Sequence, residues 1–267
     1  MTKPAPVPLA QRPIGVFDSG IGGLSILQAL RTELPDEDFV YVADSAHAPY
    51  GERDEALLNT RALHITQMLL AQHQIKALVV ACNTATAAAI AQLRALYPAL
   101  PIVGVEPALK PAAALSQTHR VGVLATRATL SSAKYQALQT SQQDQAEFVD
   151  VPCDGLAAAI EADDAHEIDR LSQLYLGALR PLGTHTGEID TIVLGCTHYP
   201  FASSVLKQHL ASNVYLLESG APVARQTRRL LEAAQLLNEH GGKLTALATG
   251  SDDSLRWGLG RWGFPLA

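Results

Sequence analysis

The sequence has few cysteines and no paired cysteine motif. Its 267 residues include only Cys82, Cys153 and Cys196, and no two of these form a Cys-x-x-Cys pair. An odd number of widely separated cysteines argues against a disulfide framework. It also argues against a zinc site, which needs closely spaced ligands. We therefore expect reduced thiols that are either buried fillers or reactive groups.

Long apolar runs and an excess of positive charge are also missing. No run approaches the roughly 20 apolar residues that a membrane helix needs, and the Pro-rich start has no signal-peptide core. The formal net charge is -6, whereas binding to nucleic acid usually requires a basic excess. The cluster of Arg225, Arg228 and Arg229 is interpreted as a solvated helix face. We expect a soluble, cytoplasmic protein with no membrane and no nucleic-acid partner.

What the chain does contain is a regular alternation of strand and helix patterns. Apolar runs that end in small or polar residues predict strands near 13–18, 38–44, 76–82 and 101–107. Helix-forming stretches follow them, including an amphipathic one over 54–74. Strands that alternate with helices of this length predict βαβ units and a parallel sheet.

The same pattern restarts near residue 120. The segment RVGVLATRATLSSAKYQALQ is similar in form to PIGVFDSGIGGLSILQAL, and DTIVLGCTHYP is similar to KALVVACNTAT. Such an internal repeat indicates a duplicated unit. We predict two similar flavodoxin-like α/β domains with mainly parallel sheets, related by pseudo-symmetry. The first comprises residues 1–106 plus 218–267, the second comprises 107–217, and the active site lies in the cleft between them.

Cys82 and Cys196 occupy matched positions in this repeat. Each ends an apolar strand, and ligands of α/β sheets bind at the carboxyl ends of strands. A single such cysteine is more often a core filler, and Cys153, which has no matched partner, is interpreted as structural. Two matched thiols, each before a helix whose dipole lowers the thiol pKa, predict one site built from both halves. His198 is close enough in sequence to tune Cys196.

Two opposed thiols favour a reaction at both faces of one carbon. One group removes a proton from one face and the other returns a proton to the opposite face, which is racemisation or epimerisation. A cysteine hydrolase needs one thiol, one base and an oxyanion hole, so it leaves the second thiol without a role. A ligand-binding protein without catalysis is a third hypothesis.

The glycine-rich segment DSGIGG, residues 18–23, fits neither phosphate-binding template. Ser25 stands where the dinucleotide fingerprint needs glycine, and the Gly-Lys-Ser/Thr ending of a P-loop is absent. We interpret it as a glycine turn that lets a bound small molecule approach backbone N–H groups. Asp18 at its start is either a helix cap or an acid/base partner.

Several motifs together resemble the glutamate racemase family, within the cofactor-independent aspartate/glutamate racemases. They are FDSGIGGLSIL, APYGER, ACNTAT, GVEPALKPA and GCTHYPF, and they run in family order between residues 14 and 229. The resemblance implies interconversion of L- and D-glutamate, which supplies D-glutamate for bacterial peptidoglycan. It implies no pyridoxal phosphate, nucleotide or metal, and it suggests a homodimer. Racemisation of aspartate or another amino acid is the alternative within the same chemistry.

The resemblance also implies roles for individual residues. Cys82 would take the α-proton of D-glutamate and Cys196 that of L-glutamate, with Asp18 assisting Cys82. Glu161 and His198 would assist Cys196. The implied substrate contacts are Asp18, Ser19, Pro49, Tyr50, Gly51, Asn83, Thr84, Thr126, Thr197 and His198. Without a cofactor, such a site must stabilise the carbanion with preorganised donors in a dry cleft that closes on the substrate.

Overall fold

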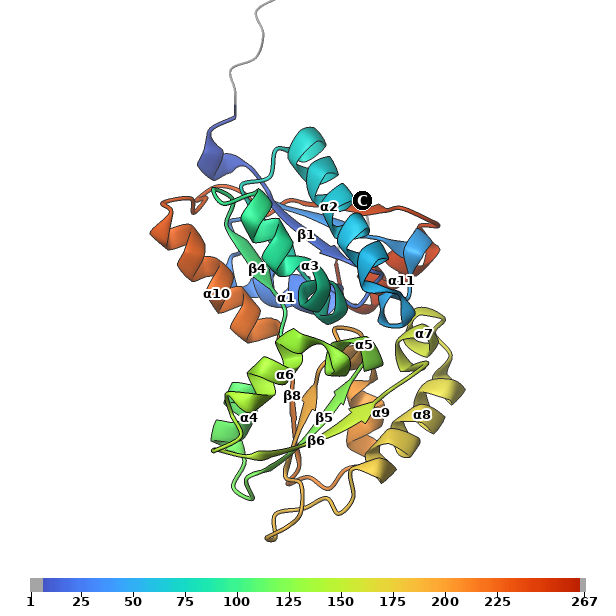
Figure 1. Cartoon of the computed structure of the whole chain (residues 1–267). Coiled ribbons are helices and arrows are strands. Elements are labelled where there is room, and N and C mark those ends of the chain that lie inside the picture. The colour runs from blue at the N-terminus through green and yellow to red at the C-terminus, as the bar shows by residue number, and fades with distance from the viewer. Residues whose placement is uncertain (1–6, 265–267) are drawn as a thin grey trace, which may run out of the picture.

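The computed structural model describes residues 7–264, and its strands form two separate sheets in which all neighbours run parallel (Figure 1). The first sheet has the order β4–β3–β1–β2–β9, with bounds Ile102–Gly104, Ala77–Val80, Ile14–Asp18, Phe39–Ala43 and Leu244–Ala248. The second has the order β6–β5–β7–β8, with bounds Glu147–Pro152, Arg120–Ala125, Thr191–Leu194 and Tyr215–Leu217. The predicted α/β class with parallel sheets is confirmed.

Both sheets arrange their strands in the same way. The first sheet contains β2–β1–β3–β4 and the second contains β6–β5–β7–β8. Counted from the first strand of each half, this is one shared order, the one that begins a flavodoxin-like sheet. The repeat that was inferred from the sequence therefore corresponds to a repeat of topology, in which β3 and β7 take equivalent places.

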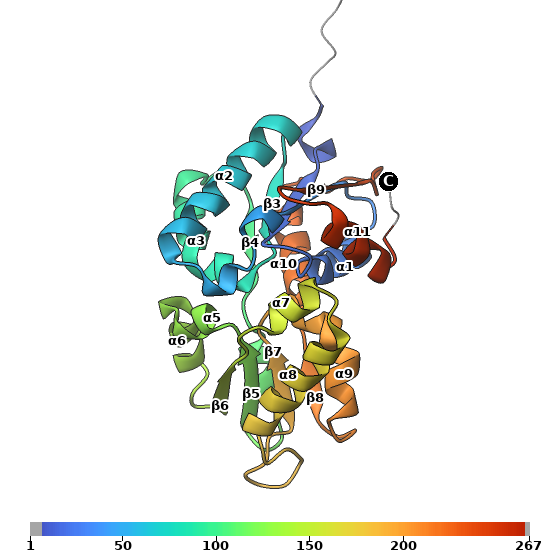
Figure 2. The same ribbon diagram turned by 90° about the vertical axis from the view of Figure 1, so that its right-hand side faces the viewer.

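Helices cover both faces of each sheet (Figure 2). Those on the first sheet are α1 (Leu24–Glu33), α2 (Glu55–His73), α3 (Asn83–Leu96), α10 (Gly220–Ala233) and α11 (Asp253–Arg261). Those on the second are α4 (Leu109–Leu115), α5 (Arg127–Ser131), α6 (Ala133–Thr140), α7 (Leu156–Glu161), α8 (Ala165–Ala178) and α9 (Ser203–Gln208). Short 3₁₀ turns lie at Leu9–Gln11, Ser45–His47, Tyr50–Glu52 and Tyr199–Ala202.

The central strands β3 and β7 are almost wholly apolar because both of their faces are covered. All four residues of β3 and all four of β7 are buried. The core also continues from one sheet to the other, since Leu24 and Tyr41 of the first half belong to the same apolar cluster as Leu194 and Tyr199 of the second. The two halves therefore share packing at the carboxyl ends of their strands.

The end of the chain returns to the first sheet, as the sequence predicted. Strand β9 pairs with β2 over Phe39–Ala43, and α11 also contacts the second half. Its Trp257 stacks on Phe201, with ring centroids 6.0 Å apart, and Trp262 meets the same ring edge-on at 4.9 Å. This aromatic contact lies directly after the segment that carries Cys196 and His198.

One helical segment of the second half is interrupted, and the chain passes once from the first sheet to the second. The helix expected after β5 is divided into α5 and α6, because Ser132 ends the first and its hydroxyl oxygen accepts the N–H of Tyr135 to begin the second, at 3.1 Å. The change of sheet falls between β4 and β5, while the domain boundaries at 106/107 and 217/218 stay a prediction. Within residues 7–264 no helix combines the length and the apolar character that a membrane crossing requires.

Candidate active site

A pocket lies between the two sheets, at the carboxyl ends of their strands. The following predicted residues line it: Ser19, Pro49, Tyr50, Gly51, Cys82, Asn83, Thr84, Thr126, Cys196, Thr197 and His198. They follow β1, β2 and β3 in the first half and β5 and β7 in the second. The structure thus brings both matched cysteines to one cavity. Asp18 and Glu161 do not line this cavity, but they contact the lining residues Ser19 and His198.

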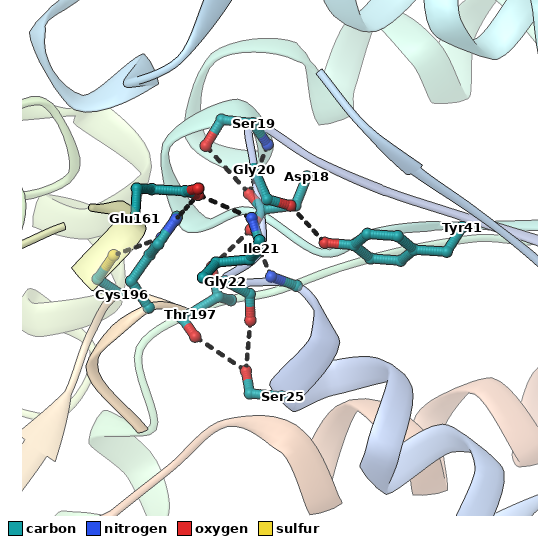
Figure 3. A network of polar contacts seen from close by, with 12 residues as sticks. Asp18, Ser19, Gly20, Ile21, Gly22, Ser25, Tyr41, Glu161, Cys196 and Thr197 are labelled. Carbon is teal, nitrogen blue, oxygen red and sulfur yellow. Dashed lines mark hydrogen bonds and ion pairs between the residues drawn. The ribbon is translucent and has the colours of Figure 1, made fainter. Parts of the chain in front are cut away.

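Cys196 belongs to a chain of buried polar contacts (Figure 3). Its Sγ lies 3.7 Å from Nδ1 of His198, and Nε2 of the same ring lies 2.7 Å from Oε1 of Glu161. Burial alone lowers the pKa of His198, but the contacts with Cys196 and Glu161 raise it well above its ordinary value. The pKa of Glu161 is lowered, because the hydrogen bond and charge of His198 outweigh burial. The pair therefore favours an imidazolium beside Cys196.

Asp18 ends β1 and holds the glycine turn together. Its carboxylate accepts the N–H of Ser19 at 2.7 Å, the N–H of Gly23, and the Thr197 hydroxyl of the other half at 3.3 Å. Burial raises the pKa of Asp18, against the opposing effect of the positive charge on His198. Asp18 therefore ties the turn before α1 to the second half, while the N-cap position itself is occupied by Gly23.

Three backbone N–H groups of the glycine turn are bound to carboxylates of the protein itself. The N–H of Ile21 donates to Glu161 at 2.7 Å, and the N–H groups of Ser19 and Gly23 donate to Asp18. The prediction that these N–H groups are left for a small molecule is therefore wrong for all three. The glycines instead make room for catalytic candidates, because a Cβ on Gly20 would lie 1.8 Å from Oε1 of Glu161.

A similar restriction applies at Gly22. A Cβ there would lie 2.4 Å from Nδ1 of His198 and 2.8 Å from Oδ2 of Asp18. Such distances are far below van der Waals contact, so any larger residue must displace one of the two side chains. The turn therefore joins the two halves by close approach of its backbone to the Glu161–His198 pair.

Cys82 stands at the N-cap of α3. Its Sγ accepts the N–H of Ala85 at 3.4 Å. The sequence predicted a lowered thiol pKa here, and this is wrong, because burial and the negative charge of Asp18 together raise the pKa of Cys82 well above its ordinary value. The helix terminus opposes this effect without overcoming it. Cys82 is therefore a protonated thiol near neutral pH.

Asn83 is the clearest sign of a ligand site. Its side chain is 4 % exposed, and neither its amide nitrogen nor its carbonyl oxygen has a hydrogen-bond partner among the described residues. A buried amide without partners costs free energy unless a ligand or water supplies them. Next to it, the hydroxyl of Thr84 lies 3.1 Å from that of Thr126 in the other half. Polar groups thus face the pocket from both halves.

Six further residues that line the pocket were not predicted from the sequence. They are Glu52, Cys153, Asp154, Gly155, Ala157 and Ala158. Most follow β6, the strand equivalent to β2. Since residues after β2 were predicted to line the site, the repeat could have predicted the segment after β6 as well. Cys153, interpreted as structural, is 2 % exposed and its thiol donates to the carbonyl of Val151 at 3.3 Å. Within residues 7–264 no group of three or more His, Cys, Asp or Glu side chains is arranged to hold a metal ion.

Comparisons with known proteins agree with this geometry. The family model described as Asp/Glu/Hydantoin racemase matches residues 23–227. The chain belongs to this family. It is 48% identical to the glutamate racemase of Ectopseudomonas mendocina over 243 residues, which cover 91% of each protein. It is an isomerase by this membership.

Solved structures are similar over almost the whole chain. A glutamate racemase from Bacillus anthracis superimposes with a TM-score of 0.84 at 29% identity, and the match covers 97% of this chain and 96% of that one. The Escherichia coli glutamate racemase, solved in complex with L-glutamate and the activator UDP-MurNAc-Ala, gives a TM-score of 0.81 at 32% identity and covers 95% and 96%. The two-sheet architecture is therefore that of glutamate racemases.

Proposed function

We propose that the protein interconverts L- and D-glutamate by proton transfer between Cα and two opposed thiols, those of Cys82 and Cys196. One observation carries this proposal: each cysteine lies two residues after one of two equivalent strands, β3 and β7, and both line the same pocket. A racemase needs one group on each face of the substrate carbon, and a pseudo-symmetric pair of strand ends supplies them. The relatives that bear the name glutamate racemase support glutamate as the substrate.

The surroundings of the two thiols differ, and they define a starting state. Cys196, which has the imidazolium of His198 beside it, is assigned the role of base. Cys82, with a raised pKa, keeps its proton and is an acid. In this state Cys196 removes the α-proton of L-glutamate while Cys82 delivers a proton to the opposite face, giving D-glutamate. The product state has the protons exchanged, with Cys82 as thiolate and Cys196 as thiol, and it is competent for the reverse reaction.

Asp18 and Glu161 would support these states. The buried Asp18 raises the pKa of Cys82, so it makes the Cys82 thiolate a strong base when D-glutamate is bound. Glu161 accepts the Nε2–H of His198 at 2.7 Å, which fixes the ring with Nδ1 toward Cys196. Each thiol thus has its own carboxylate, directly for Cys82 and through His198 for Cys196.

Substrate carboxylates would be held without lysine or arginine side chains. Among the described residues that line the pocket there is no lysine or arginine. The donors that remain are hydroxyl groups, the amide of Asn83, and backbone N–H groups where α3 begins, which favour anions. Fixed donors of this kind also stabilise negative charge that develops on the α-carboxylate as the α-proton leaves. The unpartnered amide of Asn83 supports its role as a substrate ligand.

Circular dichroism with each enantiomer and no added cofactor tests the proposal. L-glutamate and D-glutamate are each expected to lose optical activity, and a reaction in heavy water is expected to place deuterium at Cα of the product. Aspartate serves as the competing substrate, with turnover at least ~10-fold lower. No loss of signal from either glutamate enantiomer would contradict the proposal, and faster turnover of aspartate would reassign the substrate.

We further propose that the product D-glutamate serves peptidoglycan synthesis and that the protein is a homodimer. Both come from the family resemblance. A depletion strain that is rescued by external D-glutamate would support the first. Light scattering of the purified chain measures the second directly.

A further inference from the structure

Asp44 is a buried carboxylate with an unusually complete set of donors. It follows β2 directly and is 0% exposed. Its two oxygens accept hydrogen bonds from the Tyr50 hydroxyl at 2.5 Å, from Nε and Nη2 of Arg61 at 2.9 Å each, and from the Thr249 hydroxyl at 2.7 Å, with Nδ1 of His47 at 3.2 Å. Arg61 belongs to α2, and Thr249 directly follows β9. Tyr50 and His47 lie in the loop between β2 and α2. No step of the proposed racemisation uses this group.

The charge state of the network is fixed. Burial alone raises the pKa of Asp44, but hydrogen bonds from Arg61, Tyr50 and Thr249 lower it overall. Burial and the neighbouring Asp44 charge raise the pKa of Tyr50 well above its ordinary value. The phenol therefore stays protonated and the carboxylate ionised, so the bond between them is charge-assisted throughout the neutral range. Such a bond holds the Tyr50 ring in one orientation.

The hydrogen-bond network around Asp44 includes Tyr50, which lines the pocket. It is also linked to Asp18 by a backbone hydrogen bond. Tyr50 lines the pocket with its neighbours Pro49 and Gly51, and its hydroxyl is directed to Asp44 and not to the cavity. The N–H of Asp44 donates to the carbonyl of Asp18 at 2.9 Å. Displacement of Asp44 would therefore move the 49–51 segment relative to Asp18 and Cys82.

We propose that Asp44 is a positioning residue that holds Tyr50 and the 49–51 segment in the conformation that binds substrate. It does so together with Thr249, which extends the support for the site into the C-terminal strand, beyond the residues 23–227 matched by the family model. The Thr249 hydroxyl also accepts the N–H of Ala46 at 3.2 Å, so one side chain fixes both Asp44 and the loop after it. This inference rests on the proposed function, because its readout is glutamate turnover.

The test compares steady-state constants of Asp44→Asn with those of the intact enzyme. Asparagine has one acceptor oxygen in place of two and places an NH₂ against Arg61 or Tyr50, so the tyrosine loses its fixed partner. We expect KM for both glutamate enantiomers to rise about tenfold, with kcat within about threefold, because lost positioning of a binding segment weakens ground state and transition state alike. Thr249→Val, which removes one donor, is expected to give a smaller rise in KM of the same kind.

Asp190 provides a matched control. It is also buried, and it accepts the Ser116 hydroxyl at 2.6 Å and the N–H of Gln117 at 2.7 Å, but it precedes β7 at the opposite end of the sheet from the pocket. Asp190→Asn is expected to lower the melting temperature without changing KM. An equal rise of KM in this variant would show that Asp44 acts only through general stability.

A double-variant cycle tests the route through Tyr50. If Asp44 acts by holding the phenol, Tyr50→Phe and Asp44→Asn change KM by less together than the product of their separate effects. Independent, multiplicative effects would overturn the proposal, and so would an unchanged KM in Asp44→Asn. If Asp44→Asn does not fold, the same comparison of KM is made with Thr249→Val, Tyr50→Phe and the double variant of these two. Loss of turnover in the unaltered enzyme would instead count against the proposed function, which keeps the two failures distinct.

Discussion

Glu161 joins His198 to the first half of the molecule. The same oxygen, Oε1, lies 2.7 Å from Nε2 of His198 and 2.7 Å from the backbone nitrogen of Ile21. One carboxylate thus orients the imidazole beside Cys196 and fastens the second half to the glycine turn of the first. The acid/base site and the contact between the halves therefore depend on the same side chain.

Stability should depend on pH through this pair. The lowered pKa of Glu161 contributes stability that is present above about 4.5 and is lost as the pH falls through the folded value. The raised pKa of His198 contributes stability that is present below about 6.5 and is lost as the pH rises through the folded value. Glu161→Gln should therefore lower the free energy of unfolding most between about pH 4.5 and 6.5, by ~1.5–3 kcal/mol.

This window is measured by thermal melts of the intact chain and of Glu161→Gln, recorded about every half pH unit between about pH 4 and 9. The gap between the two melting temperatures should be widest inside the window and narrow on both sides. A gap that stays constant with pH would show that Glu161 stabilises by packing alone. Asp169→Asn, at the partly exposed pair with His209, is the control and should change the melting temperature little.

The two cysteines should be needed in both directions of the reaction. Cys82→Ser and Cys196→Ser each replace a thiol by a hydroxyl that is a far weaker acid, so kcat should fall ~10²–10⁴-fold. Because the two enantiomers have equal free energy in water, kcat/KM must fall by the same factor from L-glutamate and from D-glutamate. Optical rotation followed from each enantiomer measures both. Normal turnover in both single variants would refute the two-thiol mechanism.

Cys153→Ser is the matched control for the cysteine variants. This thiol also lines the pocket, but it donates to the carbonyl of Val151, a bond that a serine hydroxyl can replace. We expect racemisation within about threefold of the intact enzyme. A loss comparable to that of Cys82→Ser would mean that Cys153 takes part in the chemistry.

The sequence predicted the features that arise from local pattern and from the repeat. The apolar runs before Cys82 and Cys196 are continuous because β3 and β7 are covered on both faces, and their equivalence follows from the duplicated strand order. The association of Glu161 with Ile21 was not visible, since 140 residues separate them and only packing of the two halves brings them together.

Two other features could not be predicted for the same reason. Asp44 meets Thr249 across 205 residues, and no periodicity links a loop after β2 to the last strand. The thiol pKa at Cys82 was predicted in the wrong direction because the helix terminus is a local property, whereas burial and the approach of Asp18 are tertiary ones. Local sequence thus located the reactive groups but not the environment that sets their protonation.

The glycine turn should tolerate no side chain at residue 20. A Cβ there would overlap Oε1 of Glu161, so Gly20→Ala must push the carboxylate away from His198. We expect kcat to fall ~10²-fold, as for other small displacements of catalytic groups, together with a lower melting temperature. Gly177→Ala is the control, because no atom beyond its chain neighbours and the backbone of α8 itself lies within 4 Å of its Cβ position. That change should leave activity intact and add ~0.5–1 kcal/mol of stability.

A buried ion pair far from the pocket should govern stability without affecting turnover. Nζ of Lys76 lies 2.5 Å from Oε2 of Glu37, and both side chains are at most 1% exposed. Lys76→Met would leave the Glu37 carboxylate buried without its partner, so we expect a loss of ~3–5 kcal/mol in the free energy of unfolding. Urea unfolding measures this, and kcat of the folded fraction should be unchanged. Lys110→Met, at an exposed position, should stay within ~0.5 kcal/mol. Equal losses in the two variants would show that the pair contributes nothing specific.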